Sequence, residues 1–225
     1  MMDIPLVRQN PKSDDRLRCC ALMLFNYYGN RVSREEIWRR LHVYKKHSGL
    51  WGAYLCDLGK FATKKGFSST IFLYDWHFWN QESADACQKS AKACVASLTD
   101  LKKEKVGWGD QKVITKEINY VNAGGKFIFD FPSLTTVDGF IQKNVPVIVN
   151  VWGQDVYKNH KENYIHSILV VGKVGNNYLV RDPYLAVEEI AKDHLDFMIK
   201  RNSGWMMVIE PKPDTSKLKQ EVLKF

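Results

Sequence analysis

One run of the chain, residues 17–28, constrains the fold more than any other. Its residues, LRCCALMLFNYY, are apolar at most positions, so a helix formed here has no broad polar face. Other elements must cover such a helix on most sides, and Gly29 followed by Asn30 is typical of its end. The sequence therefore predicts a central buried helix around which the rest of the chain packs.

The segments that follow place helices first and strands later. Helices are predicted at residues 33–42, 49–66, 84–98, 113–121 and 135–143. Strands are predicted at residues 67–74, 145–151, 166–174, 177–183 and 205–210. Ser33 with Glu36 three residues later is a capping box. Short turns between the later strands are typical of an antiparallel sheet, so the predicted fold class is α+β.

The size of the chain fits one domain. With 225 residues, of which 45% are hydrophobic, it can bury one sizeable core. We predict a single domain over residues 1–210, an insertion at 75–125, and a charged C-terminal tail at 211–225. No apolar run approaches the roughly 20 residues of a membrane span, and the first residues lack the pattern of a signal peptide. We therefore expect a cytoplasmic protein without a membrane partner.

The chain is basic. Lys and Arg number 33 against 25 Asp and Glu, which gives a net charge of +8. Such a charge attracts acidic partners or nucleic acid over long range. The densest basic stretches, 39–47 and 101–112, are interrupted by apolar or acidic residues. Because no recognition motif accompanies the charge, an acidic partner stays open and a nucleic-acid site is disfavoured.

The cysteines favour reduced thiols. There are five, an odd number, in a chain too large to need disulfide staples. Cys19 and Cys20 are adjacent and Cys56 stands alone, while Cys87 and Cys94 do not have the spacing of zinc ligands. The histidines are dispersed and no glycine-rich phosphate loop is present, so the sequence predicts neither a metal nor another cofactor.

Four blocks carry a resemblance to a known family. They run from IPLVRQ to LMLFNYYG (4–29), GLWGAYLCDLGKFATKKGF (49–67), TTVDGFIQKNVPVIVNV (135–151) and HSILVVGKVGNNYLVRDP (166–183). In this order and spacing they resemble the bacteriocin-processing-peptidase-like branch of the papain-fold cysteine proteases. The resemblance covers most of the chain. It implies a papain-like fold, in which the N-terminal helix is buried against an antiparallel sheet.

The resemblance also implies an active-site arrangement. A cysteine at a helix N-terminus is deprotonated more easily because the helix dipole favours the thiolate. A histidine that leads a strand exchanges the proton, and a carboxylate on the next strand orients it. The resemblance assigns these two roles to His166 and Asp182, although Asp182 with Pro183 is also typical of a turn. Gln9 stands where the family places the amide that donates to the oxyanion, or it is a surface residue of the arm.

The nucleophile does not match. Counting by the family's spacing back from Gly29 reaches Arg16, and counting forward from Gln9 reaches Arg16 or Asp15. Arginine stays protonated and cannot attack an acyl carbon. Arg16 is therefore either an ordinary residue at the start of the helix or a ligand for an anion or carboxylate.

The two adjacent cysteines leave a second possibility. Cys19 and Cys20 lie one helical turn beyond Arg16, about 5 Å along the axis. They are either small buried residues of the central helix or a displaced nucleophile, toward which His166 would have to shift. We predict a peptidase-like protein that is degenerate for hydrolysis and binds a peptide or protein segment in the former cleft. The alternative is an active thiol hydrolase or acyltransferase that uses Cys19 or Cys20 with His166 and Asp182.

An aromatic stretch, DWHFWN, precedes the predicted helix of the insertion. Trp76 and Trp79 are its largest side chains. Such a stretch either packs as a lid on the core or lines a groove for a peptide or another flat apolar ligand. We therefore include Trp76 and Trp79 among the candidate binding residues.

Overall fold

The computed structural model describes residues 2–44, 52–75, 79–105, 107–131, 133–157 and 164–212, and of Trp108 it describes only the backbone. The helices are α1 (Arg16–Tyr27), α2 (Arg34–Arg40), α3 (Leu55–Lys64), α4 (Gln81–Lys89), α5 (Ala91–Glu104), α6 (Trp108–Asn122), α7 (Leu134–Gln142), α8 (Gly153–Val156) and α9 (Lys192–Arg201). The strands are β1 (Phe67–Leu73), β2 (Lys126–Phe129), β3 (Val147–Trp152), β4 (Ile165–Val174), β5 (Asn177–Arg181), β6 (Glu189–Ala191) and β7 (Met206–Pro211). The predicted mixture of helices and strands is confirmed.

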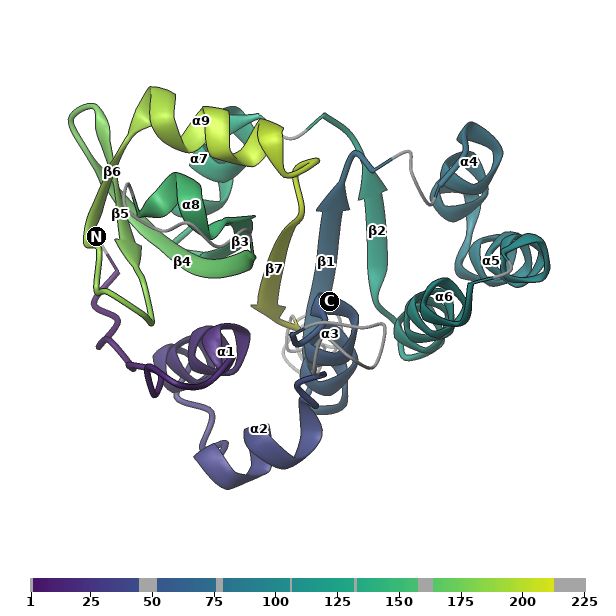
Figure 1. The fold of residues 1–225 in the computed structure, drawn as a ribbon, viewed down its shortest axis with the longest axis horizontal. Coiled ribbons are helices and arrows are strands. Elements are labelled where there is room, and N and C mark those ends of the chain that lie inside the picture. Colours follow the sequence, from purple (N-terminus) through teal and green to yellow (C-terminus); the bar gives the residue numbers. More distant parts are fainter. Residues whose placement is uncertain are drawn as a thin grey trace, which may run out of the picture.

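The strands form a seven-stranded sheet in the order β2-β1-β7-β3-β4-β5-β6 (Figure 1). Its paired strands are antiparallel except β1 and β2, which run parallel. The register of β3 with β4 places Val151 opposite His166. The predicted antiparallel sheet of the later strands is therefore confirmed.

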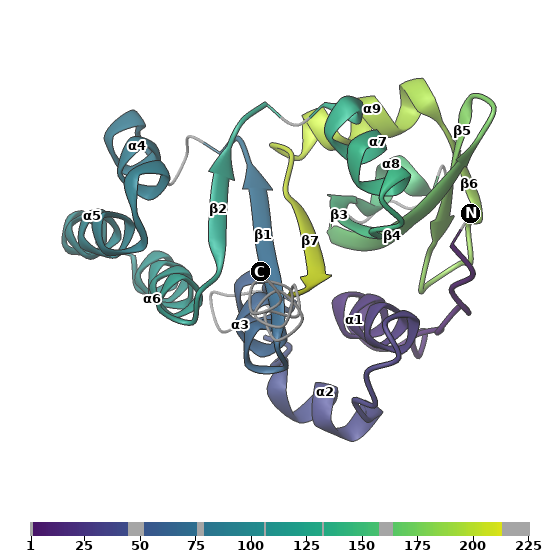
Figure 2. The same ribbon diagram turned by 180° about the vertical axis from the view of Figure 1, so that it is seen from behind.

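Each face of the sheet is covered by a different set of helices. α1 and α3 pack on one face, where Ile148, Leu169 and Met207 point, and α7 and α9 cover the other, where Val149, Ile168 and Met206 point. Figures 1 and 2 show these two layers from opposite sides. The alternation along β3, β4 and β7 divides the apolar residues between two cores.

The central helix is buried as predicted. Its buried residues are Leu17, Cys19, Cys20, Ala21, Met23, Leu24 and Phe25. Gly29 has a φ of 66°, a left-handed conformation that glycine adopts without strain, and it ends the helix. The expected cap of α2 is also present, because the Ser33 side chain accepts a hydrogen bond from the backbone N–H of Glu36.

The helix predicted over residues 84–98 is wrong in its continuity. The chain breaks at Ser90, whose φ of −169° and ψ of 158° are extended, and two helices, α4 and α5, result. The Ser90 side chain accepts a hydrogen bond from the N–H of Ala93 and so caps α5. Figures 1 and 2 place α4, α5 and α6 beyond β2, at the edge of the sheet.

The prediction of five reduced cysteines is wrong for one pair. Cys87 in α4 and Cys94 in α5 form a disulfide across the break at Ser90. On one continuous helix, residues seven positions apart would be separated by about 10 Å, so the break makes the bond possible. Cys19, Cys20 and Cys56 are free and buried.

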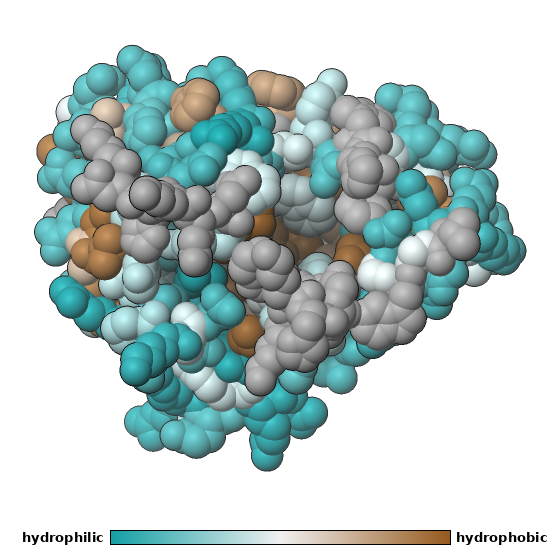
Figure 3. Space-filling model, viewed as in Figure 1, coloured by the Kyte–Doolittle hydropathy of each residue, from teal (hydrophilic) through white to brown (hydrophobic). Residues whose placement is uncertain are grey.

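The outer surface is polar over several helices. Figure 3 shows mostly hydrophilic residues over α2 and α9, and a hollow with hydrophobic residues near the centre of this face. The sequence did not predict β6 or α9, which follow β5 and precede β7 along the chain. Within the described ranges, no helix combines the length and apolar character needed to cross a membrane.

Candidate functional site

A histidine and an aspartate meet at one end of the sheet. His166 is the second residue of β4, Asp182 directly follows β5, and both side chains are 0% exposed. Nε2 of His166 lies 2.7 Å from Oδ1 of Asp182. The hydroxyl of Tyr157, just after α8, donates to the same oxygen at 2.7 Å and lies 2.9 Å from Nε2. We refer to His166, Asp182 and Tyr157 as the His166 cluster.

Hydrogen bonds keep Asp182 charged despite its burial. Burial raises the pKa of this carboxyl, but the hydrogen bond and charge of His166 oppose it, followed by the Tyr157 hydroxyl and the backbone N–H of Tyr184. Together they lower the pKa of Asp182 to about 2. The Tyr157 hydroxyl has the opposite shift, because burial and the Asp182 carboxylate raise its pKa.

Asp182 also organises the turn after β5. Its Oδ1 accepts the N–H of Tyr184 at 3.0 Å, and its Oδ2 accepts the N–H groups of Leu185 at 3.0 Å and Val187 at 3.3 Å. The two interpretations of Asp182, as partner of His166 and as a turn residue, therefore both hold. The turn fixes the carboxylate, and the carboxylate fixes the imidazole.

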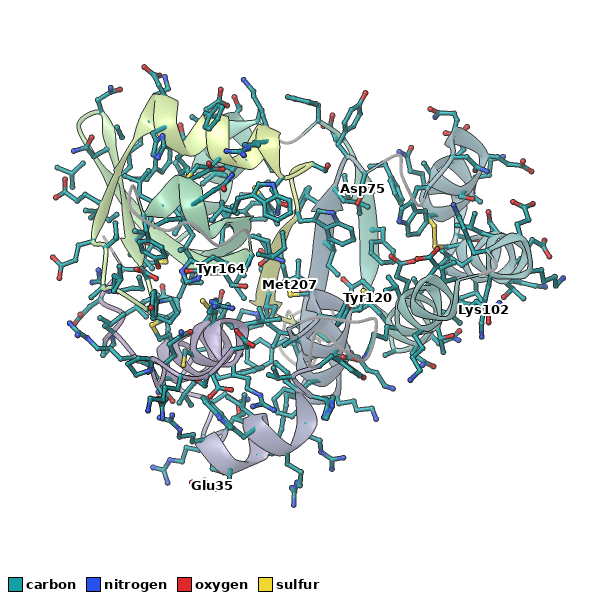
Figure 4. The ribbon with its side chains drawn as sticks, in the orientation of Figure 1. Glu35, Asp75, Lys102, Tyr120, Tyr164 and Met207 are labelled. Carbon is teal, nitrogen blue, oxygen red and sulfur yellow. A yellow bond between two sulfur atoms is a disulfide. The ribbon has the colours of Figure 1, made fainter. Side chains whose placement is uncertain are left out.

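Tyr164 joins the His166 cluster to the start of α1. Its ring centroid is 6.4 Å from that of His166, and the guanidinium carbon of Arg16 lies 4.2 Å from the Tyr164 ring centroid. Figure 4 shows Tyr164 between α1 and β4. Gly153 makes room for the ring, because a Cβ at this position would lie 2.5 Å from it. The stacking of a cation on an aromatic ring is favourable.

Arg16 is the first residue of α1 and its side chain is 14% exposed. Nη1 donates to Oδ1 of Asp14 at 2.9 Å. Nε is buried and has no hydrogen-bond partner in the described part of the chain. The side chain of Arg16 therefore lies across the helix entry. An ordinary exposed arginine would extend into solvent instead.

The carboxylate of Asp15, the residue before Arg16, is hydrogen-bonded to residues other than Arg16. Asp15 precedes α1, yet its oxygens accept from Arg18 at 2.7 Å and from the Trp38 indole at 3.2 Å. The side chain of Asp15 therefore makes no cap bond to the helix, and the first turn of α1 holds no acidic residue. The positive end of the α1 dipole lies beside the guanidinium of Arg16 without a local carboxylate on the helix.

Gln9 lies beside this helix entry and is 6% exposed. Its backbone N–H donates to the carbonyl of Pro183 at 2.9 Å, next to Asp182. Its side-chain nitrogen donates one of its two hydrogens to the carbonyl of Ser13 at 3.2 Å, so the amide that the sequence resemblance assigns to an oxyanion is held by its own loop. The side-chain oxygen is buried, and no described residue gives it a hydrogen bond.

Both thiols of α1 lie in the core. Cys19 and Cys20 are each 0% exposed. Burial, with the charge of Asp15, raises the pKa of Cys19 to about 12, and burial raises that of Cys20 well above its ordinary value. The Cys20 thiol donates to the carbonyl of Ser167 at 3.4 Å. In this arrangement both sulfurs are protonated at neutral pH and inaccessible to a substrate.

The aromatic candidates differ from the rest of the site. Trp79 is 2% exposed and packs against Phe127 and Phe129 of β2, with ring centroids 5.2 and 4.5 Å apart. This burial agrees with the packing interpretation of Trp79 rather than with a groove. Trp76 lies outside the described residues.

Two tyrosines of the site were not predicted from the sequence. Tyr157 and Tyr164 reach the site from the connection between β3 and β4. No motif marks Tyr157, and the only signal for Tyr164 is its place two residues before His166. Within the described segments, no group of three or more His, Cys, Asp or Glu side chains could hold a metal ion.

Comparison with known proteins adds evidence on the fold. No protein-family model and no curated protein sequence matches the chain. A solved structure of a C39-like peptidase from Bacillus anthracis matches with a TM-score of 0.52 and 10% identity, covering 93% of this chain and 95% of that chain.

Two further solved structures match at lower TM-scores. The peptidase domain of Streptococcus ComA, a bifunctional ABC transporter involved in quorum sensing, has a TM-score of 0.49 and 14% identity, covering 93% of this chain and 100% of that chain. A double glycine motif protease from an AMS/PCAT transporter, in complex with the leader peptide, has a TM-score of 0.48 and 14% identity, covering 94% of each chain.

The match to the Bacillus anthracis peptidase concerns the fold alone, because the sequence identity is low. It agrees with the element order, the sheet and the buried N-terminal helix described above. The chain has the α+β fold of the papain-like C39 peptidases, as its sequence predicts.

Proposed function

We propose that this chain is a cysteine-peptidase-like protein that does not hydrolyse peptides and instead binds a peptide or protein segment in the former active-site cleft. The observation that carries the proposal is the position of Arg16 at the first residue of α1, stacked on Tyr164. Thiol peptidases of this fold place their nucleophile at the entry of the corresponding helix. A guanidinium is always protonated and has no lone pair for attack on an acyl carbon.

The thiols of α1 support the proposal over the enzyme alternative. A displaced nucleophile has to reach both the substrate and His166, whereas Cys19 and Cys20 are 0% exposed. Their raised pKa values disfavour the thiolate that such chemistry requires. An active thiol hydrolase or acyltransferase would therefore need α1 to shift relative to the sheet.

The His166 cluster supports a binding role as well. Its imidazole is 0% exposed, and a general acid or base has to come within hydrogen-bond reach of the substrate. The Tyr157 hydroxyl and the Asp182 carboxylate lie within hydrogen-bonding distance of the same nitrogen, Nε2. In this arrangement the His166 cluster has a structural role, because its hydrogen bonds connect β4, the turn after β5 and the residue after α8.

The fold supports a peptide as the ligand. The structure from Bacillus anthracis with the same fold is a C39-like peptidase, a class of protein that accommodates peptides. The whole chain has a net charge of +8, which favours an acidic partner, and we include such a partner in the proposal.

Timed labelling with limiting iodoacetamide near neutral pH tests the missing nucleophile. Each cysteine is measured by peptide mass spectrometry in the wild type and in the Arg16→Cys variant. We expect slow labelling of Cys19, Cys20 and Cys56 in both proteins, and labelling of the new thiol at least tenfold faster. Adding His166→Ala to Arg16→Cys controls for assistance by the imidazole.

The labelling outcomes separate the two functions. Rapid labelling of Cys19 or Cys20 in the wild type, lost in His166→Ala, would contradict the proposal and favour the enzyme. Binding measurements complete the test, because Arg16→Ala should weaken peptide binding while replacing both thiols of α1 should not. A nucleic-acid module would instead bind its ligand with an affinity that falls steeply with salt.

A further inference from the structure

The guanidinium of Arg16 has an unused hydrogen-bonding edge. Nη1 is bound to Asp14, and the ring of Tyr164 covers one face of the group. Nε is buried without a partner among the described residues, and within the same part of the chain Asp14 is the only acceptor bound to the guanidinium. Buried donors are nearly always satisfied in folded proteins, and the Arg16 side chain, unlike those of Cys19 and Cys20, is partly exposed, so a ligand can supply the missing acceptor. The free edge, Nε with Nη2, matches the two oxygens of a carboxylate.

Gln9 offers the complementary group beside the same helix entry. Its side-chain nitrogen donates one hydrogen to the Ser13 carbonyl, and the amide oxygen is a buried acceptor without a partner in the described ranges. The residue is more than nine-tenths buried and is tied by its backbone to Pro183. The site therefore presents an acceptor from Gln9 and a donor edge from Arg16.

The electrostatics of the entry favour a negative group at the donor edge. The first turn of α1 has no acidic residue, and Asp15 is held by Arg18 and Trp38. Asp14 is the carboxylate bound to Arg16, and its side chain is 41% exposed, so solvent weakens its neutralising effect. The helix dipole adds to the attraction for an anion at this position.

We infer that the site binds the free C-terminus of a peptide, with the terminal carboxylate on the Nε–Nη2 edge of Arg16 and the last backbone N–H donating to Oε1 of Gln9. This inference rests on the proposed function and names its ligand. A C-terminal residue carries an N–H and a carboxylate on the same Cα, which matches one acceptor and one forked donor. An internal peptide bond has no charge to pair with the guanidinium, and an acidic side chain lacks the adjacent N–H.

A pair of peptide pools tests the inference. N-terminally fluorescein-labelled hexapeptides with randomised last three positions are made with a free C-terminal carboxylate and, identically, with a C-terminal amide. Fluorescence anisotropy should give the acid pool at least tenfold tighter binding to the wild type, because a charge-assisted hydrogen bond is lost in the amide. In Arg16→Gln the acid pool should fall to the level of the amide pool, and Gln9→Leu should weaken both pools.

Control variants and outcomes make the test decisive. Arg34→Gln changes an arginine that stacks on Trp38 outside the site, and it should leave the preference for the acid unchanged. Thermal unfolding of Arg16→Gln verifies that the variant is folded. Equal binding of both pools to the wild type, or an acid preference that persists in Arg16→Gln, overturns the inference while peptide binding stands. Failure of both pools to bind at millimolar concentration overturns the proposed function together with the inference.

Discussion

Two buried carboxyl groups on opposite sides of the molecule behave in opposite ways. Asp182, in the His166 cluster, is 0% exposed and Glu117, on α6, is 1% exposed. The pKa of Asp182 falls to about 2, whereas burial and the nearby charge of Asp75 raise that of Glu117 to about 8. The two carboxyl groups are equally buried, yet Asp182 in the candidate site is ionised at neutral pH and Glu117 in the helices beyond β2 is neutral.

Hydrogen-bond donors account for the difference. Asp182 receives a tyrosine hydroxyl, three backbone N–H groups and the imidazole of His166. Oε2 of Glu117, by contrast, has no hydrogen-bond partner among the described residues, and the Trp79 side chain offsets only part of the effect of burial and Asp75 on the pKa of Glu117. A carboxylate in low dielectric stays charged only when donors replace its water. The candidate site therefore contains an ionised carboxylate that is fully buried and hydrogen-bonded through both of its oxygens.

Replacing Glu117 with glutamine should produce the largest effect. A folded-state pKa raised from 4.5 to about 8 gives stability that is complete below pH 4.5 and is lost as the pH rises toward 8. Wild-type stability should therefore fall by about 3–5 kcal/mol across this range, and the Glu117→Gln variant should not show this loss. Urea unfolding between pH 4.5 and 9 measures both curves.

The exposed Glu82 in the first turn of α4 provides the matched control. Glu82→Gln should leave the pH dependence of unfolding as in the wild type. Parallel curves for the wild type and Glu117→Gln would contradict the assignment of a neutral buried carboxyl to α6.

Replacing Asp182 with asparagine should have the opposite dependence on pH. A folded-state pKa lowered from 3.8 to about 2 gives stability that is present above pH 3.8 and is lost as the pH falls toward 2. At neutral pH the variant should lose about 2–4 kcal/mol, because the amide NH2 group would face backbone N–H groups. Urea unfolding at pH 7 and pH 2 should show this difference shrinking in acid. Asp100→Asn, at a side chain 69% exposed, should change stability little at either pH.

The sequence was most informative where a local pattern decides the structure. The apolar run of α1, the cap at Ser33 and the left-handed Gly29 follow from residue types and spacing, and the structure confirms each. The pairing of His166 with Asp182 followed from a family resemblance, since 16 residues separate the two positions along the chain. Local signals alone would not have joined them.

The rest depends on tertiary contacts that no local pattern encodes. Serine is tolerated within helices, so the break at Ser90 and the disulfide that it permits gave no signal. Tyr157 and Tyr164 reach the site through the pairing of β3 with β4. The burial of Glu117 likewise depends on how α6 packs, because a carboxylate on a helix is usually exposed.

Reduction of the disulfide should affect the helices beyond β2 and leave the candidate site unchanged. The bond closes a short loop between α4 and α5, for which the chain-entropy model gives about 2 kcal/mol. We expect reductant to speed amide hydrogen exchange in α4 and α5 and to leave α1 and β4 unchanged. A Cys87→Ser, Cys94→Ser double variant should be insensitive to reductant. Equal acceleration in β4 would contradict the separation.

Removing the Tyr157 hydroxyl should have the smallest effect and should sharpen the contrast within the His166 cluster. Tyr157→Phe deletes one of several donors to Asp182 and leaves His166 and the backbone N–H groups in place. The expected loss is about 1 kcal/mol, since the carboxylate stays paired. Tyr27→Phe, whose hydroxyl donates to the Asn144 carbonyl at an exposed position, should lose less. If Tyr157→Phe destabilised the protein as much as Asp182→Asn, the phenol rather than the backbone turn would be the main support of the buried charge.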